Sequence, residues 1–309
     1  MRESDITSRL RAAARIPSGS QLVLGIGDDC AIWRPRGSAD DLLFTADLFV
    51  ENVHFLRATH KARDVGYKAV ARSLSDIAAM GGTPQFCLSA VAIPQWANRK
   101  WIDSFFDAAV ETASAAGCIL AGGDLTQAAA FACDITVCGS VPRGRALRRD
   151  GARKGHDIYV SGALGGSALG LAEGKLRGKA WKRHLQPEPR LALGRFLREK
   201  IGASAAIDIS DGLSLDLQRL CLASGLAADI VEPPCFAGAS LEQSLHGGEE
   251  YELLFTVPAG TKVPPHLNQL PLTRIGNMVP GSPGEVRLKG AVLPSLGYDH
   301  FRYSASPDQ

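Results

Sequence analysis

The stretch GIGDDCA, residues 25–31, follows the apolar run Leu22-Val23-Leu24 and places two adjacent carboxylates in a glycine-containing loop. The apolar run predicts a strand, and the glycines predict a loop at its end. Adjacent carboxylates repel each other, so a loop that holds both Asp28 and Asp29 is expected to have a counter-charge nearby. The stretch therefore raises the question of whether a metal ion or a cationic substrate binds here.

Composition limits the class of protein around this loop. The chain has 309 residues, which predicts two domains or one large one, and 45% of its residues are hydrophobic, enough for a sizeable core. Its net charge of +2 gives no electrostatic reason to expect a nucleic-acid partner. Neither a run of about 18 apolar residues nor the apolar segment of a secretory signal occurs, so we expect no membrane span and a cytoplasmic protein.

The cysteines support the same compartment. There are seven, an odd number, and no CxxC pattern joins any two of them: Cys30, Cys87, Cys118, Cys133, Cys138, Cys221 and Cys235. We expect all seven to be reduced and to lie in or near the core, without a role in disulfides or zinc binding.

Predicted strands and helices alternate along the chain. In the first half, strands are expected within residues 42–55, 86–94, 118–124 and 134–141, and amphipathic helices at 62–80 and 98–116. The basic stretch 142–157 interrupts the apolar pattern and marks a boundary between domains 1–143 and 144–309. In the second half, strands are expected at 157–162, 206–210 and 251–257, and helices at 167–174, from Pro187 to about Lys200, and at 211–225. The pattern predicts a mixed α/β (α+β) protein of two domains.

Acidic residues recur at predicted strand ends and beside glycines. Asp76 differs, because it lies on a partly apolar helix face. Each acid alone is explained by turn or capping chemistry; Asp211 suits a helix N-cap and Glu250 a solvated loop. Taken as a group, they favour a Mg²⁺–phosphate site, because Mg²⁺ prefers carboxylates together with substrate phosphates. The group comprises Asp28, Asp29, Asp47, Asp76, Asp124, Asp208 and Asp211.

The common phosphate-binding motifs are absent, since the chain has no P-loop, no protein-kinase signature and no GxGxxG after a strand. Gly165-Gly166-Ser167 opens a helix and either offers N–H groups to an anion or forms a simple tight loop. His54 is either structural or, being near Asp47, part of the site. Two groups of basic residues are either solvated or have a specific partner. The partner would be phosphate for Arg145, Arg148 and Arg149, and acidic side chains for Lys68 and Arg72.

Nine motifs then occur in a fixed order between residues 25 and 301: GIGDDCA, TADLFVENVHF, LSDIAAMGG, AGGDLT, GRALRRDGA, RHLQPEPR, AIDISDGL, GGEEYELLFTV and GYDHF. Together they resemble the thiamine-monophosphate kinase family, in the superfamily of aminoimidazole ribonucleotide synthetase and selenophosphate synthetase. The resemblance covers nearly the whole chain. It implies phosphoryl transfer from ATP to thiamine monophosphate, giving thiamine diphosphate and ADP. It also implies a two-domain synthetase-like fold, a homodimer whose N-terminal sheets form a β-barrel, and a nucleotide cleft between the domains.

The resemblance also implies roles for individual residues. Several Mg²⁺ ions would be held by Asp29, Thr45, Asp47, Asp76, Asp124, Asp208 and Asp211. Nucleotide contacts would come from Gly123, Asp124, Arg149 and Ser210, and contacts to the thiamine phosphate from His54, Glu249 and Tyr298. The carboxylate of Glu249 would suit the cationic thiazolium, and the ring of Tyr298 would stack on it. No residue is assigned as a general acid or base, because the acceptor phosphate is already ionised and in-line positioning with charge neutralisation suffices.

The sequence departs from the family pattern at Ala46, Asn52, Arg72-Ser73, Gly166 and Glu250, which leaves the number of metal ions and the loop contacts open. Two alternatives stay open. The first is a related ATP-dependent synthetase that acts on a purine precursor or on selenide. Selenide as substrate is disfavoured, because no reactive cysteine lies near a glycine-rich N-terminus. A non-catalytic sensor of thiamine phosphates or nucleotides is disfavoured by the retained acids.

Overall fold

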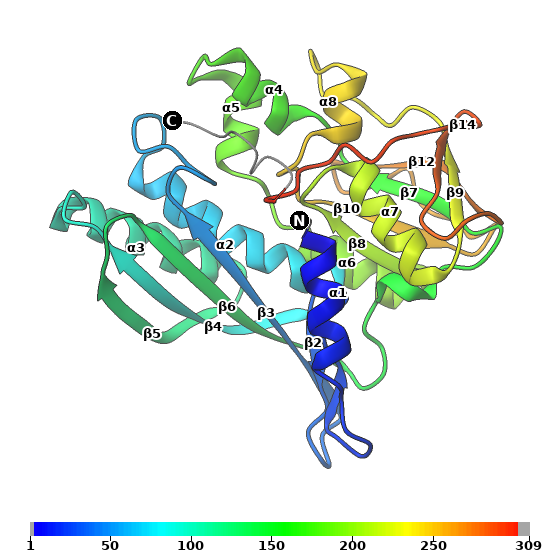
Figure 1. The fold of residues 1–309 in the computed structure, drawn as a ribbon, viewed down its shortest axis with the longest axis horizontal. Coiled ribbons are helices and arrows are strands. Elements are labelled where there is room, and N and C mark those ends of the chain that lie inside the picture. Colours follow the sequence, from blue (N-terminus) through cyan, green and yellow to red (C-terminus); the bar gives the residue numbers. More distant parts are fainter. Residues whose placement is uncertain (1–2, 302–309) are drawn as a thin grey trace.

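The first half of the chain forms a six-stranded sheet with helices on one face, as seen in the computed structural model, which describes residues 3–301 (Figure 1). The strand order is β1-β2-β3-β6-β4-β5, and only β4 and β5 pair in parallel. The strands are β1 (Leu22–Leu24), β2 (Ala31–Trp33), β3 (Asp40–Val50), β4 (Thr83–Ile93), β5 (Ile119–Gln127) and β6 (Ala132–Pro142).

Two helices, α2 (Ala62–Ala79) and α3 (Arg99–Ala115), cover the upper face of this sheet in Figure 1. Strand β3 shows why, because its side chains alternate: Leu43 and Phe49 are buried on the helix side, whereas Phe44 and Leu48 are exposed on the other. Helix α3 begins as predicted, since the Asn98 side chain accepts a hydrogen bond from the Trp101 N–H at 3.0 Å.

The second half forms an eight-stranded sheet in the order β14-β13-β9-β12-β7-β10-β8, with β11 paired to β12. Its strands are β7 (Asp157–Ser161), β8 (Ala205–Ile209), β9 (Ala227–Ile230), β10 (Glu252–Val257), β11 (His266–Leu267), β12 (Leu270–Val279), β13 (Val286–Leu288) and β14 (Ala291–Val292). Its helices are α4 (Gly166–Glu173), α5 (Gly178–Leu185), α6 (Leu191–Phe196), α7 (Leu213–Ser224) and α8 (Leu241–His246). The two sheets confirm the mixed α/β class, while the domain boundary at residues 143 and 144 stays a prediction.

Helix α2 is the element shared by the two halves. It packs on β3 and β6 of the first sheet, and it also contacts helix α6 and strand β8 in the second half of the chain. Most of its residues are buried, including the polar Lys68, Ser73 and Ser75. Polar side chains on this helix therefore meet groups from both halves, and this position creates the candidate site.

Two sequence predictions fail in this part of the chain. The helix predicted from Pro187 begins only at Leu191, because Pro189 restricts the residue before it to extended conformations. Helix α5 was not predicted at all; it spans only eight residues, too few for a clear periodicity. The cysteine prediction holds for six buried free thiols but is wrong for Cys235, which lies exposed in a connecting segment.

The N-terminal helix α1 (Glu3–Ala13) has no buried residue and crosses between the two sheets in the view of Figure 1. The Glu3 N–H donates to an Asp299 carboxylate oxygen at 3.4 Å, so this helix lies beside the end of the described chain. Within residues 3–301, no helix has both the length and the apolar character needed to cross a membrane.

Candidate active site

Three carboxylates from separate elements meet where α2 faces β8. Asp29 comes from the loop between β1 and β2, Asp76 from α2 and Asp208 from β8, and one oxygen of each lies within 4.8 Å of the others. Hydroxyls orient two of them: Ser75 donates to Asp208 at 2.6 Å, and Thr45 donates to Asp76. We call Asp29, Asp76 and Asp208 the acid trio.

The electrostatics of the acid trio favour the binding of a cation. Burial, reinforced by the charges of neighbouring carboxylates, raises the pKa of Asp76 and of Asp208 well above the usual range. Three oxygen ligands this close are a hard donor set of the kind that binds Mg²⁺. The residues present therefore fit the predicted divalent metal ion, which would cancel the repulsion between them.

The two adjacent acids of the opening loop have different roles. The Arg149 guanidinium donates to Asp29 at 2.6 and 3.2 Å, so part of the expected counter-charge comes from the chain itself. Asp28 accepts the backbone N–H of Asp29 at 3.0 Å and that of Arg149 at 3.2 Å, which shapes the loop. Burial and the neighbouring charge of Asp29 raise the pKa of Asp28 to about 7. Asp29 is the member of the pair that belongs to the acid trio.

Lys68, Arg72 and Asp76 are spaced four residues apart and therefore lie along one face of α2. Lys68 is buried, and its ammonium lies 2.9 Å from the carboxylate of Glu249 and 3.4 Å from the His184 imidazole. Arg72 lies 3.8 Å from Asp47. Of the two readings left open by the sequence, pairing with an acid is confirmed for Lys68, whereas Arg72 makes only a long ion-pair contact with Asp47.

Glu249 is fixed by a tight turn. Its φ of 61° lies in the left-handed region, and its N–H donates to the Ser210 carbonyl at 2.6 Å. Its second carboxylate oxygen lies 3.3 Å from His184. Burial opposes the charge, but Lys68 and His184 outweigh it and lower the pKa of Glu249 to about 2. Cationic and imidazole groups of the chain thus already face the carboxylate expected to meet the thiazolium.

His54 and Tyr298, predicted to contact the same substrate, lie near each other. The His54 ring stacks on Phe49 at 5.3 Å and lies 5.3 Å from the ring of His300, which is 4.8 Å from that of Tyr298. The His54 Nδ1 accepts the Val50 N–H at 3.0 Å. Burial and the charge of Arg72 lower the pKa of His54 to about 3, so its imidazole is neutral at pH 7. The structure brings the loop after β3 and the GYDHF segment to one place.

Other predicted residues lie apart from the acid trio. Asp211 pairs with Arg219 at 2.6 Å and does not cap α7, whose N-cap is Gly212. The expected N-cap was wrong, because the Asp211 carboxylate instead pairs with Arg219, about two turns along α7. Gly123 and Asp124 lie exposed on β5, three strands from β3, which is about 14 Å in a sheet. Within the described chain, Asp124 thus does not join the acid trio.

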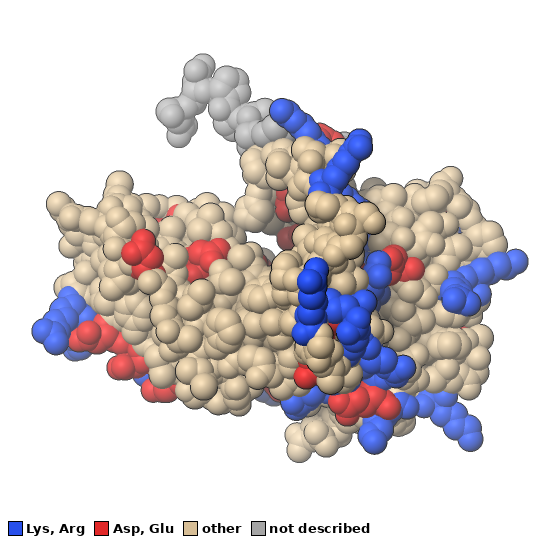
Figure 2. Space-filling model, turned by 90° about the horizontal axis from the view of Figure 1, so that it is seen from below, with Lys and Arg blue, Asp and Glu red and all other residues tan. Residues whose placement is uncertain are grey.

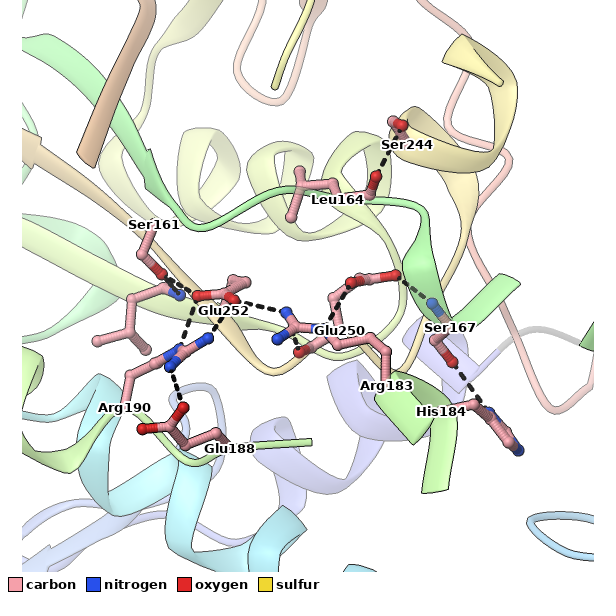
Figure 3. Close-up of polar contacts among 11 residues, drawn as sticks. Ser161, Leu164, Ser167, Arg183, His184, Glu188, Arg190, Ser244, Glu250 and Glu252 are labelled. Carbon is pink, nitrogen blue, oxygen red and sulfur yellow. Dashed lines mark hydrogen bonds and ion pairs between the residues drawn. The ribbon is translucent and has the colours of Figure 1, made fainter. Parts of the chain in front are cut away.

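A buried ion-pair network that the sequence analysis missed supports the Glu249 turn (Figure 3). Arg183 contacts Glu250 at 3.3 Å and Glu252 at 2.5 Å, and Arg190 contacts Glu252 at 2.6 Å. Glu250 also accepts the Ser167 N–H at 2.9 Å, so the Gly165-Gly166-Ser167 loop binds an anion from its own chain. The expectation that Glu250 is a solvated loop acid was wrong. The sequence contained a signal for this network, because the RHLQPEPR motif supplies both arginines and the GGEEYEL motif supplies both glutamates.

Comparison with known proteins agrees with this architecture. Residues 27–141 match the family model described as AIR synthase related protein, N-terminal domain, so the first half of the chain contains a domain of the AIR synthase-related class. The chain is 37% identical to the thiamine-monophosphate kinase of Escherichia coli (strain K12), covering 90% of this chain and 92% of that protein. It is 32% identical to the Bacillus subtilis (strain 168) protein of the same name, covering 92% and 95%.

A solved structure described as "AaThiL complexed with AMPPCP and TMP" superposes with a TM-score of 0.84 at 29% identity, covering 97% of both chains. The chain belongs to the thiamine-monophosphate kinase family.

Proposed function

We propose that this chain transfers the γ-phosphoryl group of ATP to the phosphate of thiamine monophosphate, giving thiamine diphosphate and ADP. The acid trio carries the proposal, since it forms a metal-binding donor set where the two halves of a family member meet. The solved relative is described as a complex with AMPPCP, an ATP analogue, and with TMP, which supports the assignment of both substrates. We place the site in a cleft between domains 1–143 and 144–309, and we propose that the enzyme is cytoplasmic.

The chain's own residues would act by binding and orientation. Asp29, Asp76 and Asp208 would hold Mg²⁺, and Thr45 and Ser75 fix the rotamers of two of them. When bound, Mg²⁺ supplies charge neutralisation between the two anionic substrates. We assign no general base among residues 3–301, because an acceptor phosphate that is already ionised needs none. Neutral His54 is a hydrogen-bonding group for substrate, not a proton donor at pH 7.

The remaining predicted contacts belong to the same proposal. Asp47 lies near the acid trio and would bind a further Mg²⁺ ion, whereas Asp211 would do so only by leaving Arg219. Arg149 would contact nucleotide from its place beside Asp29, with Ser210 as a second contact. Gly123 and Asp124 suit a nucleotide contact better than a shared metal ion, because Asp124 does not belong to the group of described carboxylates whose oxygens lie within 4.8 Å of one another.

A homodimer is supported by the uncovered face of the first sheet. Large apolar side chains are exposed there on β3 and β4, which flank β6, with Leu48 at 57% and Leu88 at 40%. Figure 2 views the molecule from below and shows this region largely free of charged side chains. An apolar face of this kind marks an interface. Two such faces packed together would give the predicted dimeric β-barrel.

The deciding experiment incubates the protein with ATP, Mg²⁺ and thiamine monophosphate and measures thiamine diphosphate and ADP. Formation of both products supports the kinase. Binding of both substrates without turnover would instead identify a sensor, and ADP formed only with another acceptor would identify a related synthetase. Asp124→Asn separates roles within the site: we expect a raised KM for ATP with unchanged Mg²⁺-dependent stability.

A further inference from the structure

Arg72 is the middle residue of the α2 face that also carries Lys68 and Asp76. Two of its guanidinium nitrogens, Nε and Nη1, are buried and have no hydrogen-bond partner among the described residues. The third nitrogen, Nη2, lies 3.8 Å from an Asp47 oxygen, which is longer than a hydrogen bond. The side chain as a whole is 13% exposed, so part of it is accessible from solvent.

Its two neighbours on the helix face are satisfied in a way that Arg72 is not. Lys68 has Glu249 at 2.9 Å, and Asp76 accepts a hydrogen bond from Thr45. Buried donors of a charged group cost free energy when they are left unpaired, so such donors are usually matched by a partner, an ion or a water. The group that complements two adjacent guanidinium N–H donors is an oxyanion with two acceptor oxygens.

The position of Arg72 identifies the oxyanion. Four residues along a helix are about 6 Å, so Arg72 lies one such step from Asp76 and one from Lys68. Its guanidinium carbon lies 5.3 Å from the centre of the Phe49 ring, and the His54 ring stacks on that same ring. Arg72 thus lies between the acid trio and the residues predicted to contact the thiamine phosphate.

We propose that Arg72 binds the phosphate of thiamine monophosphate through its unpartnered guanidinium donors, and so determines the preference for phosphorylated over unphosphorylated thiamine. This inference rests on the proposed function. The planar fork of arginine matches two phosphate oxygens, which the ammonium of a lysine does not.

The test compares Arg72→Met and Arg72→Lys with the unchanged protein. The matched control is Arg63→Met on the same helix, because Arg63 is exposed and pairs with Glu111 outside the site. Dissociation constants for thiamine monophosphate and for thiamine are measured by titration calorimetry with Mg²⁺, and KM values by turnover. We expect Arg72→Met to weaken binding of thiamine monophosphate about 10- to 100-fold while thiamine binding and the KM for ATP change less than about twofold.

Arg72→Lys should recover part of the preference, and it keeps a positive charge beside Asp47 if the methionine variant does not fold. An unchanged ratio of the two dissociation constants in a folded variant would overturn the proposal, as would a raised KM for ATP alone. Failure of the unchanged protein to turn over thiamine monophosphate is a different result, because it refutes the proposed function itself.

Discussion

Replacing Asp76 with asparagine separates the electrostatic cost of the acid trio to protein stability from its proposed role in binding Mg²⁺. The substitution keeps the shape of the side chain and an oxygen that can accept the Thr45 hydrogen bond, but it removes one negative charge. We therefore expect Asp76→Asn to make the metal-free protein more stable and, at the same time, almost inactive. A purely structural carboxylate predicts the opposite change in stability.

The size of the effect follows from the geometry. Two ionised carboxylate oxygens within 4.8 Å repel each other by about 3 kcal/mol at an effective dielectric constant of about 20. The raised pKa of Asp76 means that the metal-free protein avoids part of this repulsion by binding a proton. We therefore expect the free energy of unfolding of metal-free Asp76→Asn to exceed that of the unchanged protein by about 1 kcal/mol.

The assay is urea unfolding of both proteins, with EDTA and with saturating Mg²⁺. A ligand present at 100 times its dissociation constant stabilises a protein by about 2.7 kcal/mol, and a tenfold weaker site loses about 1.4 kcal/mol of that gain. Asp76→Asn should therefore gain at least about 1 kcal/mol less from Mg²⁺, and its turnover should fall at least about 100-fold. Asp103→Asn, exposed on α3 and outside both the acid trio and the proposed interface, is the control.

Equal stabilisation of both proteins by Mg²⁺ would refute the assignment of the acid trio as a metal site. A loss of metal-free stability in Asp76→Asn beyond that of the control would refute the electrostatic reasoning.

Three other outcomes are expected. Arg183→Met leaves Glu250 and Glu252 short of a buried cation and should lower the free energy of unfolding by about 3–5 kcal/mol in urea, against less than about 1 kcal/mol for the exposed pair residue in Arg274→Met; similar losses would contradict the network's role. Lys68→Met removes the cation that contributes most to holding the pKa of Glu249 at about 2, so its unfolding free energy should fall most at pH 7, and the deficit should shrink as the pH falls from 4.5 toward 2 and the carboxyl of the unchanged protein binds a proton; a pH-independent deficit would contradict this sign. Leu48→Asp should convert a dimer to a folded monomer in sedimentation velocity, and a monomeric unchanged protein would remove the proposed interface.

Local patterns carried much of the fold. The alternation in residues 42–55 and the helical spacing of residues 62–80 are properties of short segments, and the structure has β3 and α2 there. Pro189 and the short α5 show the limit, because one proline or eight residues change a boundary without changing the wider pattern.

The candidate site divides in the same way. The motifs alone indicated that Asp29, Asp76 and Asp208 belong to one metal site, although 47 and 132 residues separate them in sequence. The sequence did not indicate which cation faces which acid. Arg149 faces Asp29, Arg219 faces Asp211, and Lys68 faces Glu249.

The sequence by itself determined the class of fold, the family and the kind of chemistry, because apolar periodicity and ordered motifs are written along the chain. Only the tertiary structure decided that Asp28 shapes the loop while Asp29 joins the acid trio, that Glu250 is buried against Arg183, and that Arg72 has donors without a described partner. The physical reason is that pairing and burial depend on distances between segments, which α2 sets by packing against both halves of the molecule.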